Sequence, residues 1–278
     1  MQSLAEAMQE AKLNSVEDAL VAADPRAVFS VKKVIPSYEG PIFMVRYMLK
    51  DETEKIFDRD GVLQSEKGTP LAMLSKPSIY LVETWYDQSG NELNATQPDK
   101  YMQPFLNLKE TGEYVVDFRF CRYMNLPDGT VPCGNTPHSI IFKHGEISNP
   151  IGGVIGTGKY ECQSACNAIR RSGDAYVNYF WSNDLLTTHG SYKPGNTVAF
   201  IFSSNGKHGS VINGKFNATR ENVSKFSWPS ANTIGKTYGD NEYLNGELQF
   251  LYITKEIARK SVSLVTGMWK EAIDFQVC

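Results

Sequence analysis

The sequence Ile79-Tyr80-Leu81-Val82-Glu83-Thr84-Trp85-Tyr86-Asp87-Gln88-Ser89-Gly90 indicates the fold class of this chain. Its first eight residues are rich in β-branched and aromatic side chains, which favour a half-buried, pleated strand. The Asp, Ser and Gly that follow are typical of tight turns. The stretch therefore predicts a strand that runs directly into a turn.

Short stretches of this kind recur along the chain, separated by Gly, Pro and Asn. The clearest is a hairpin over residues 196–213, in which the apolar residues 198–202 lead to Asn205-Gly206, a pair suited to a hairpin turn. Helices do not alternate with these strands. The pattern therefore predicts an all-β fold, an antiparallel β-sandwich or jelly roll, and not an α/β fold.

Helical patterns are confined to the two ends of the chain. Apolar residues recur at helical spacing over residues 3–23, and Asp24-Pro25 ends the pattern. A second helical pattern begins at about Thr254. We therefore expect a helical arm in residues 1–25 and a sandwich domain in residues 26–278 that closes with a C-terminal helix.

The composition argues against several partners. The formal net charge of the 278 residues is −3, which gives no electrostatic reason to expect nucleic acid. Basic pairs such as Lys32-Lys33 and Arg170-Arg171 are expected on the solvated surface. No run reaches the roughly 18 apolar residues of a membrane span, and the amino terminus lacks the apolar centre of a secretory signal. We expect synthesis inside the cell and no membrane span.

The cysteines do not predict a metal site. There are five, so at least one is unpaired within the monomer. Cys162 and Cys166 have a spacing close to that of zinc ligands, but no second pair and no nearby His complete a tetrahedral site. We expect free thiols, no metal and no cofactor.

The turn at residues 85–90 also resembles a known family. Trp-Tyr-Asp-Gln-Ser-Gly, with Ser37-Tyr38-Glu39-Gly40-Pro41 upstream, is similar to segments of the family 54 α-L-arabinofuranosidase catalytic domain, a β-sandwich of the concanavalin A-like lectin/glucanase superfamily. The strand that ends at Asn213-Gly214-Lys215 resembles laminin G-like sandwiches. Such jelly rolls occur in structural proteins of large DNA viruses. The resemblance implies a concanavalin A-like fold over about residues 27–270.

The same resemblance implies a pair of catalytic carboxylates. The family uses a Glu nucleophile and an Asp acid/base, and the matching positions here are Glu161 and Asp240, the latter within Gly239-Asp240-Asn241. Retaining glycosidases hold two such groups about 5 Å apart. The adjacent cysteine pair that supports the sugar in the family is missing before Glu161.

Four further residues are expected to contact a glycan. The rings of Trp85, Tyr86 and Trp181 are suited to stacking on sugars, and Asp87 lies beside two of them in the sequence. Each has a structural alternative. A Trp in a strand pattern is often part of the core, and an Asp in a turn often accepts hydrogen bonds from its own backbone.

Three kinds of function remain open. The first is a non-catalytic jelly-roll module that serves as a subunit of a larger assembly, such as a minor capsid or other virion protein, and binds a glycan. The second is a retaining α-L-arabinofuranosidase-like glycoside hydrolase that uses Glu161 and Asp240. The third is a lectin-like protein whose partner is another protein. Because the family's enzymes are secreted and this chain shows no export signal, we expect the first, with other protein subunits and a glycan as partners.

Overall fold

The computed structural model describes residues 24–49, 52–73, 79–134, 136–158, 165–182, 184–203, 207–220, 232–238 and 241–255. Over these ranges the chain consists of strands joined by tight turns, with one short 3-10 helix. The expected all-β antiparallel sandwich is confirmed. The helical arm and the C-terminal helix fall outside the described residues, and β19 continues to Lys255, past the expected helix start. Within the described part, no helix is long and apolar enough to cross a membrane.

The strands follow one another along the chain without intervening α-helices in the described ranges. They are β1 (Pro25–Ser30), β2 (Phe43–Tyr47), β3 (Thr53–Arg59), β4 (Val62–Ser65), then the 3-10 helix η1 (Leu71–Met73), β5 (Tyr80–Trp85), β6 (Ala95–Thr96), β7 (Phe105–Leu108), β8 (Tyr114–Asp117), β9 (Met124–Asn125), β10 (His138–Ile147), β11 (Gly153–Gly158), β12 (Cys166–Ser172), β13 (Ala175–Tyr179), β14 (Leu185–Leu186), β15 (Thr197–Phe202), β16 (His208–Ile212), β17 (Lys215–Arg220), β18 (Thr233–Ile234) and β19 (Gly246–Lys255).

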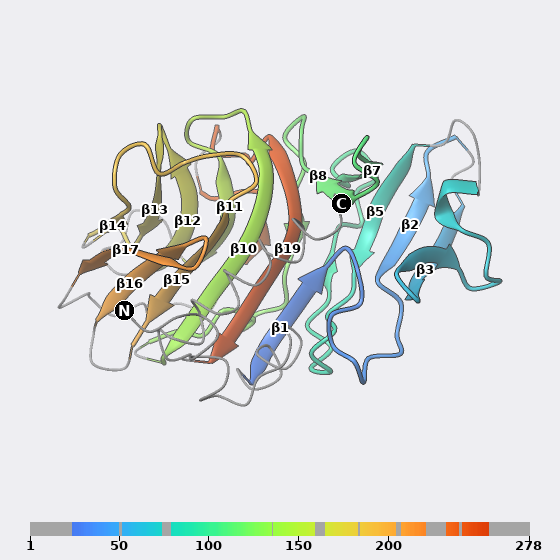
Figure 1. Ribbon diagram of the computed structural model, residues 1–278, viewed down its shortest axis with the longest axis horizontal. Coiled ribbons are helices and arrows are strands. Elements are labelled where there is room, and N and C mark those ends of the chain that lie inside the picture. The colour runs from blue at the N-terminus through green and yellow to red at the C-terminus, as the bar shows by residue number, and fades with distance from the viewer. Residues whose placement is uncertain are drawn as a thin grey trace.

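The strands form two layers whose inner faces share one core. The first layer has the order β17-β16-β15-β10-β19-β1, and these neighbours lie side by side in Figure 1. The second has the order β14-β13-β12-β11-β18-β9-β6-β5-β2-β3-β4. β8 pairs with β19 and, through β7, with β5, so it connects the two layers. Every strand pair is antiparallel, as the alternating pattern predicts.

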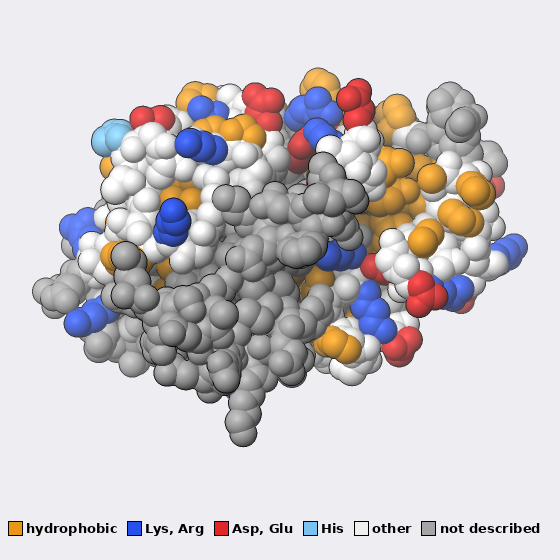
Figure 2. All heavy atoms as spheres, viewed as in Figure 1, with side chains coloured by type: hydrophobic (Ala, Val, Ile, Leu, Met, Phe, Trp, Pro, Cys, Tyr) orange, Lys and Arg blue, Asp and Glu red, His pale blue; other side chains and the backbone are white. Residues whose placement is uncertain are grey.

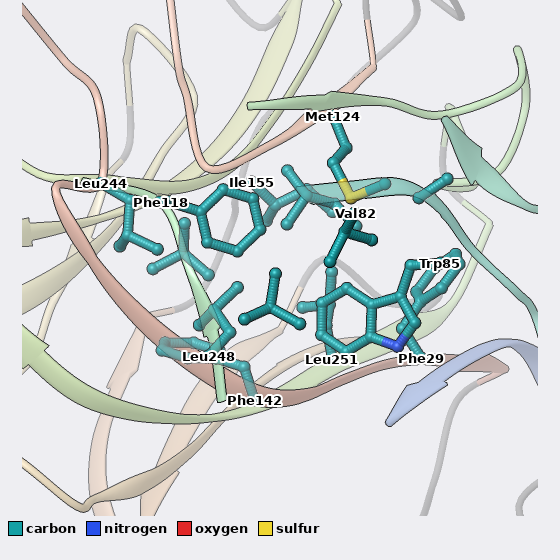
Figure 3. Close-up of a cluster of buried hydrophobic side chains, with 14 of the residues drawn as sticks. Phe29, Val82, Trp85, Phe118, Met124, Phe142, Ile155, Leu244, Leu248 and Leu251 are labelled. Atoms are coloured by element: carbon teal, nitrogen blue, oxygen red, sulfur yellow. The ribbon is translucent and has the colours of Figure 1, made fainter. Parts of the chain in front are cut away.

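The core is built from apolar side chains of both layers. Trp85 is fully buried, with its ring centroid 5.8 Å from that of Phe29 and 5.9 Å from that of Phe43. Figure 3 shows Trp85 beside Phe29 and Leu251, which come from strands of the opposite layer. Burial of such large rings removes much apolar surface from water and is a main source of stability.

The turn after β5 attaches this strand to β1. The Asp87 Oδ1 atom accepts a hydrogen bond from the backbone N–H of Val28 (2.8 Å), and the N–H of Gln88 donates to Val28 O (2.9 Å). The Gln88 side chain accepts from the N–H of Val34 (2.9 Å) and donates to Lys32 O (2.9 Å). The turn thus fixes the end of β5 against β1 and the loop that follows β1.

The sequence pattern misplaces part of β19. Alternation predicts that Leu248, Phe250 and Tyr252 share one face. In the structure Leu248 belongs to the central core, whereas Phe250 and Tyr252 stack on each other on the opposite face of the sheet (ring centroids 4.4 Å apart). The reason is a β-bulge at Gln249, since β10 pairs with Leu248 and Phe250 at consecutive positions.

The predicted hairpin is confirmed. β15 and β16 pair from Val198↔Ile212 to Phe202↔His208. The Asn205-Gly206 turn lies outside the described residues. The next turn, Asn213-Gly214, joins β16 to β17 with φ angles of 47° and 74°. Two consecutive positive φ angles suit a two-residue hairpin turn, and Asn-Gly adopts them at low cost.

A buried histidine, His208, lies among aromatic side chains. The ring of His208 is in contact with Phe180, Phe200 and Phe202, at centroid distances from 5.2 to 6.3 Å. Among the described residues, neither of its ring nitrogens has a hydrogen-bond partner. Burial, with the nearby His138 and Arg220 adding to the effect, lowers the pKa of His208 to about 3. The folded protein therefore holds His208 in its neutral form.

We predict that Trp85→Ala lowers the free energy of unfolding by about 3–5 kcal/mol, because it leaves a cavity in the core and removes the hydrogen bond from Nε1 to Ser30 O (3.0 Å). Tyr101→Ala, at a ring that is 73% exposed, should change it by no more than about 0.5 kcal/mol. Urea unfolding measures both values. Equal losses would contradict the placement of Trp85 in the core.

We also predict that acid destabilises the protein through His208. Its pKa is about 6.5 in an unfolded chain and about 3 in the fold, so the unfolded state binds more protons between these values. Stability should be unaffected above pH 6.5 and should fall as the pH is lowered towards 3. Urea midpoints measured across this range should vary less with pH in His208→Phe, and His189→Phe, at an exposed ring, serves as the control. If the urea midpoint of His208→Phe falls with decreasing pH as steeply as that of the parent protein, His208 does not have this role.

Candidate functional site

Two of the residues expected to bind a glycan have structural roles instead. The Trp85 indole is completely buried. The Asp87 carboxylate is 3% exposed and accepts hydrogen bonds from the N–H groups of Val28 and Ser89 at Oδ1 and from the N–H of Leu93 at Oδ2 (2.8, 2.9 and 3.1 Å). The expectation of sugar contact is corrected for both, because neither side chain is presented to solvent. The alternatives, a core Trp and a turn-capping Asp, describe what is observed.

The other two expected residues keep part of their surface. Tyr86 is half-buried, and burial, followed by the charge of Glu83, raises its pKa. Trp181 is also half-buried, and its ring packs edge-on against Tyr179 at the end of β13, with centroids 5.8 Å apart. Tyr86 follows β5 and Trp181 follows β13, two different strands of the second layer, and only Trp181 lies near the candidate site described next.

Glu161 and Asp240 lie outside the described residues, but the residues that flank them are described. β11 ends at Gly158 and β12 begins at Cys166, and these two residues are paired in the antiparallel register. Tyr238 immediately precedes the segment that contains Asp240. The strand pairs β11–β12 and β11–β18 bring the two flanking regions to the same part of the second layer.

Tyr238 is the side chain that links the two regions. It is half-buried, and the backbone of Thr157 and Asn167, the Cys166 thiol and the Glu242 carboxylate lie close enough to influence its pKa. Burial is the main cause that raises its pKa, so the phenol stays protonated at neutral pH. Residues just before the Asp240 segment and residues on both sides of the Glu161 segment thus meet at one place.

A buried carboxylate lies beside this tyrosine. Glu242 is 8% exposed, forms an ion pair with Arg170 and accepts a hydrogen bond from the Thr237 hydroxyl. The Arg170 guanidinium also lies over the Tyr179 ring, 4.9 Å from its centroid. The expectation that Arg170-Arg171 is a solvated surface pair is therefore wrong for Arg170, whose side chain is 21% exposed.

Arg171 is likewise engaged. Its Nε atom donates to Gly173 O (2.7 Å), another guanidinium nitrogen donates to Ile147 O, and its guanidinium lies 4.0 Å from the centroid of the Tyr192 ring. A pair of charged residues in the sequence predicts an exposed position. In the fold, however, carbonyl, carboxylate and aromatic groups surround Arg170 and Arg171.

Two glycines within residues 152–158 allow β11 and the segment that carries Thr237 and Glu242 to approach each other closely. A Cβ atom on Gly153 would lie 2.6 Å from Glu242 O and from Thr237 N, and one on Gly156 would lie 3.0 Å from Thr237 Cα. Any larger residue at Gly153 would displace the segment that carries Thr237 and Glu242. The Gly-rich run is thus a strand, β11, that accepts the backbone of this segment on its surface.

A chain of buried polar side chains supports β12 from inside the sandwich. The Asn167 side chain donates to His138 Nε2 (3.1 Å) and accepts from the Asn178 amide (2.6 Å). His138 Nδ1 lies 2.9 Å from Thr136 O, so Nδ1 carries the proton and Nε2 accepts. Burial lowers the pKa of His138, which keeps this ring neutral and its tautomer fixed.

The arrangement provides charged and hydrogen-bonding groups in fixed positions. The ion pair of Arg170 and Glu242, the neutral phenol of Tyr238 and the rings of Tyr179 and Trp181 lie around the ends of β11, β12 and β13. The described part of the chain has no group of three or more His, Cys, Asp or Glu side chains that holds a metal ion. We refer to Tyr238, Glu242, Arg170, Tyr179 and Trp181 as the candidate site.

Sequence reasoning identified one of these five residues, Trp181. Tyr238 lies two residues before Asp240 and Glu242 two residues after it, so a wider window around the matched Gly-Asp-Asn turn would have included both. Arg170 and Tyr179 carry no signal in the sequence, because only the fold places Arg170 between the Glu242 carboxylate and the Tyr179 ring.

No protein-family model and no curated protein matches this chain. Among solved structures, a GH54 α-L-arabinofuranosidase soaked with a cyclic sulfate inhibitor is similar, with a TM-score of 0.70 and 13% identity. An arabinofuranosidase complexed with arabinofuranosyl-α-1,2-xylobiose (0.67) and a mutant GH54 arabinofuranosidase soaked with 4-nitrophenyl α-L-arabinofuranoside (0.66) are also similar, both with 13% identity. Each match covers 92% of this chain and 65% of the other chain.

These matches show that the chain has the β-sandwich fold of these glycosidases. The chain spans 65% of the length of the proteins it matches, so the likeness covers one part of each of them. The solved structures named above are glycosidases, and they give no support to the expected laminin G-like and virion relationship.

We predict that Asn167→Ala lowers the free energy of unfolding by about 1–3 kcal/mol, because it leaves the buried His138 Nε2 and the Asn178 amide without this partner. Chemical denaturation measures the loss. Asn217→Ala removes a more exposed amide and is the matched control. If both variants unfold at the same denaturant concentration as the parent, the polar chain does not stabilise β12.

Proposed function

We propose that the protein is a carbohydrate-active protein of the glycoside hydrolase type, with its active site at the ends of β11, β12 and β13. One observation carries the proposal: β11 pairs with both β12 and β18, and its Gly153 lies against Thr237 and Glu242, which brings together the regions of the chain that flank Glu161 and Asp240. Two carboxyl groups that face one sugar are what glycoside hydrolysis requires.

The substrate class follows from the structural neighbours. The similar proteins are arabinofuranosidases, and their structures contain α-L-arabinofuranoside ligands or an inhibitor. We therefore propose a terminal α-L-arabinofuranoside as the substrate. Glu161 is proposed as the nucleophile that forms a bond to the anomeric carbon, and Asp240 as the acid that protonates the departing oxygen and then removes a proton from the attacking water.

The described residues have a positioning role in this proposal. Thr237 and Glu242 are joined by a backbone hydrogen bond from Thr237 N to Glu242 O (3.1 Å) and by the bond from the Thr237 hydroxyl to the Glu242 carboxylate. The segment that contains Asp240 therefore begins and ends at one place on β11. Arg170 forms an ion pair with the Glu242 carboxylate and compensates its charge.

Trp181 and Tyr179 supply the apolar surface of the site. Half-buried aromatic rings combine a flat apolar face with low conformational freedom, so they suit the C–H faces of a sugar. The Arg170 guanidinium against the Tyr179 ring holds this ring in place.

We predict that the protein releases 4-nitrophenol from 4-nitrophenyl α-L-arabinofuranoside, and that Glu161→Gln and Asp240→Asn each lower kcat/KM by at least about a hundredfold. Both substitutions keep the size of the side chain and remove its acid chemistry. Asp128→Asn, on an exposed loop, is the control and should leave the rate unchanged. Release of 4-nitrophenol is followed by absorbance, and anomeric retention by NMR.

The outcome distinguishes the open functions. If the folded parent protein binds the substrate but does not hydrolyse it, the protein is a non-catalytic glycan-binding module. If it neither binds nor hydrolyses arabinofuranosides, the proposed function is wrong, and the result favours a role as a subunit of a larger assembly.

A further inference from the structure

A hollow in the surface lies away from the candidate site. It is a groove of about 610 Å³ over β8, β10 and β19, and six charged side chains line it: Lys109, Glu113, Arg119, Lys143, Glu146 and Glu247. We call it the charged groove. Figure 2 shows Lys or Arg and Asp or Glu side chains together at the upper edge of the molecule, above these strands. Its size is within the range of small-molecule sites, about 300–1,000 Å³.

The charged groove continues into a neighbouring hollow. A further hollow of about 530 Å³ follows the turn between β7 and β8 and shares Lys109, Arg119 and Glu247 with the groove. Together they offer a continuous surface for an extended ligand. The groove lies on the outer face of the first layer, whereas the candidate site belongs to β11, β12 and β13 of the second layer.

Backbone hydrogen bonds fix the walls of the groove. The turn between β7 and β8 is closed by Lys109 N to Glu113 O (2.8 Å), and Gly195 N donates to His144 O (2.9 Å) on the opposite wall. Glu247 lies directly over Gly145, since a Cβ atom on Gly145 would be 2.2 Å from the Glu247 Oε2 atom. The walls are therefore formed before a ligand arrives, which lowers the entropic cost of binding.

The charges in the groove balance. Lys109 Nζ lies 2.7 Å from Glu247 Oε1, and Arg119 is paired with the buried Asp117 and also faces Glu247 and Glu146. The Gln249 amide donates to Glu113 (3.1 Å). Among the residues that the structure describes, three cations and three carboxylates line the groove, so a ligand with a strong charge of either sign meets repulsion as well as attraction.

A ligand with many hydroxyl groups fits these features. Each hydroxyl donates to a carboxylate and accepts from a Lys or Arg at the same time, and hydrogen bonds to charged groups are stronger than neutral ones. The exposed Pro194 adds apolar surface for the C–H face of a sugar. We propose that the charged groove binds a short neutral oligosaccharide. The choice of a sugar rests on the proposed function, whereas the neutral, polyhydroxylated character rests on the groove itself.

The test is calorimetric titration of the full chain with two neutral probes, xylotriose and arabinotriose, and two charged probes, trigalacturonic acid and chitotriose with free amino groups. At least one neutral probe should bind, and Lys109→Met and Gln249→Ala should each weaken its binding about tenfold, since each removes hydrogen-bonding groups from the groove. Lys215→Met, at an exposed position on β17, should bind as the parent does.

Further readouts separate this inference from the proposed function. In NMR titrations of the parent and of Glu161→Gln, the neutral probe should shift the signals of β8, β10 and β19. If the parent hydrolyses nothing but the groove signals still shift, the proposed function fails and the groove is a glycan site. No binding of neutral probes, tighter binding of a charged probe, or unchanged affinity in Lys109→Met with an unchanged thermal midpoint would each overturn the inference.

Discussion

The hydrogen bond from the Val28 amide to the Asp87 carboxylate is the constraint on which much of the fold depends. β1 and β5 belong to different layers of the sandwich, and this carboxylate, together with the Gln88 backbone and side chain, joins them at one corner. The Trp85 indole is placed by the same turn and donates to Ser30 O of β1. A buried carboxylate is stable only when its oxygens are satisfied, so the turn, the two strands and the indole specify one another.

The candidate site and the charged groove differ in how they are built. The candidate site depends on small residues, because Gly153 and Gly156 let the segment with Thr237 and Glu242 lie on β11. The charged groove depends on turns at the edge of the first layer and on charges that compensate one another. A sandwich can carry both because its two layers present separate outer faces.

Much of the fold follows from local pattern. The alternation of apolar and polar residues, the turn residues and the Asn-Gly hairpin predict antiparallel strands, and the structure has them. Pattern fails at β19, where one extra residue at Gln249 moves Phe250 and Tyr252 to the face opposite Leu248. A bulge is set by the register with β10, which a single strand does not encode. The candidate site was predicted least well, since Arg170 and Tyr179 become neighbours of Glu242 only through strand pairing.

The sequence by itself determined that the chain forms a β-sandwich and that the protein carries no strong net charge. For Asp87 it left two roles open, capping its own turn or contacting a sugar. Only the tertiary structure decided between the alternatives for individual side chains. Trp85 and Asp87 are interior groups, whereas Trp181 is half-buried and packs against Tyr179. The physical reason is that burial and charge pairing depend on what lies across from a residue, and in a sandwich these neighbours come from strands distant in the chain.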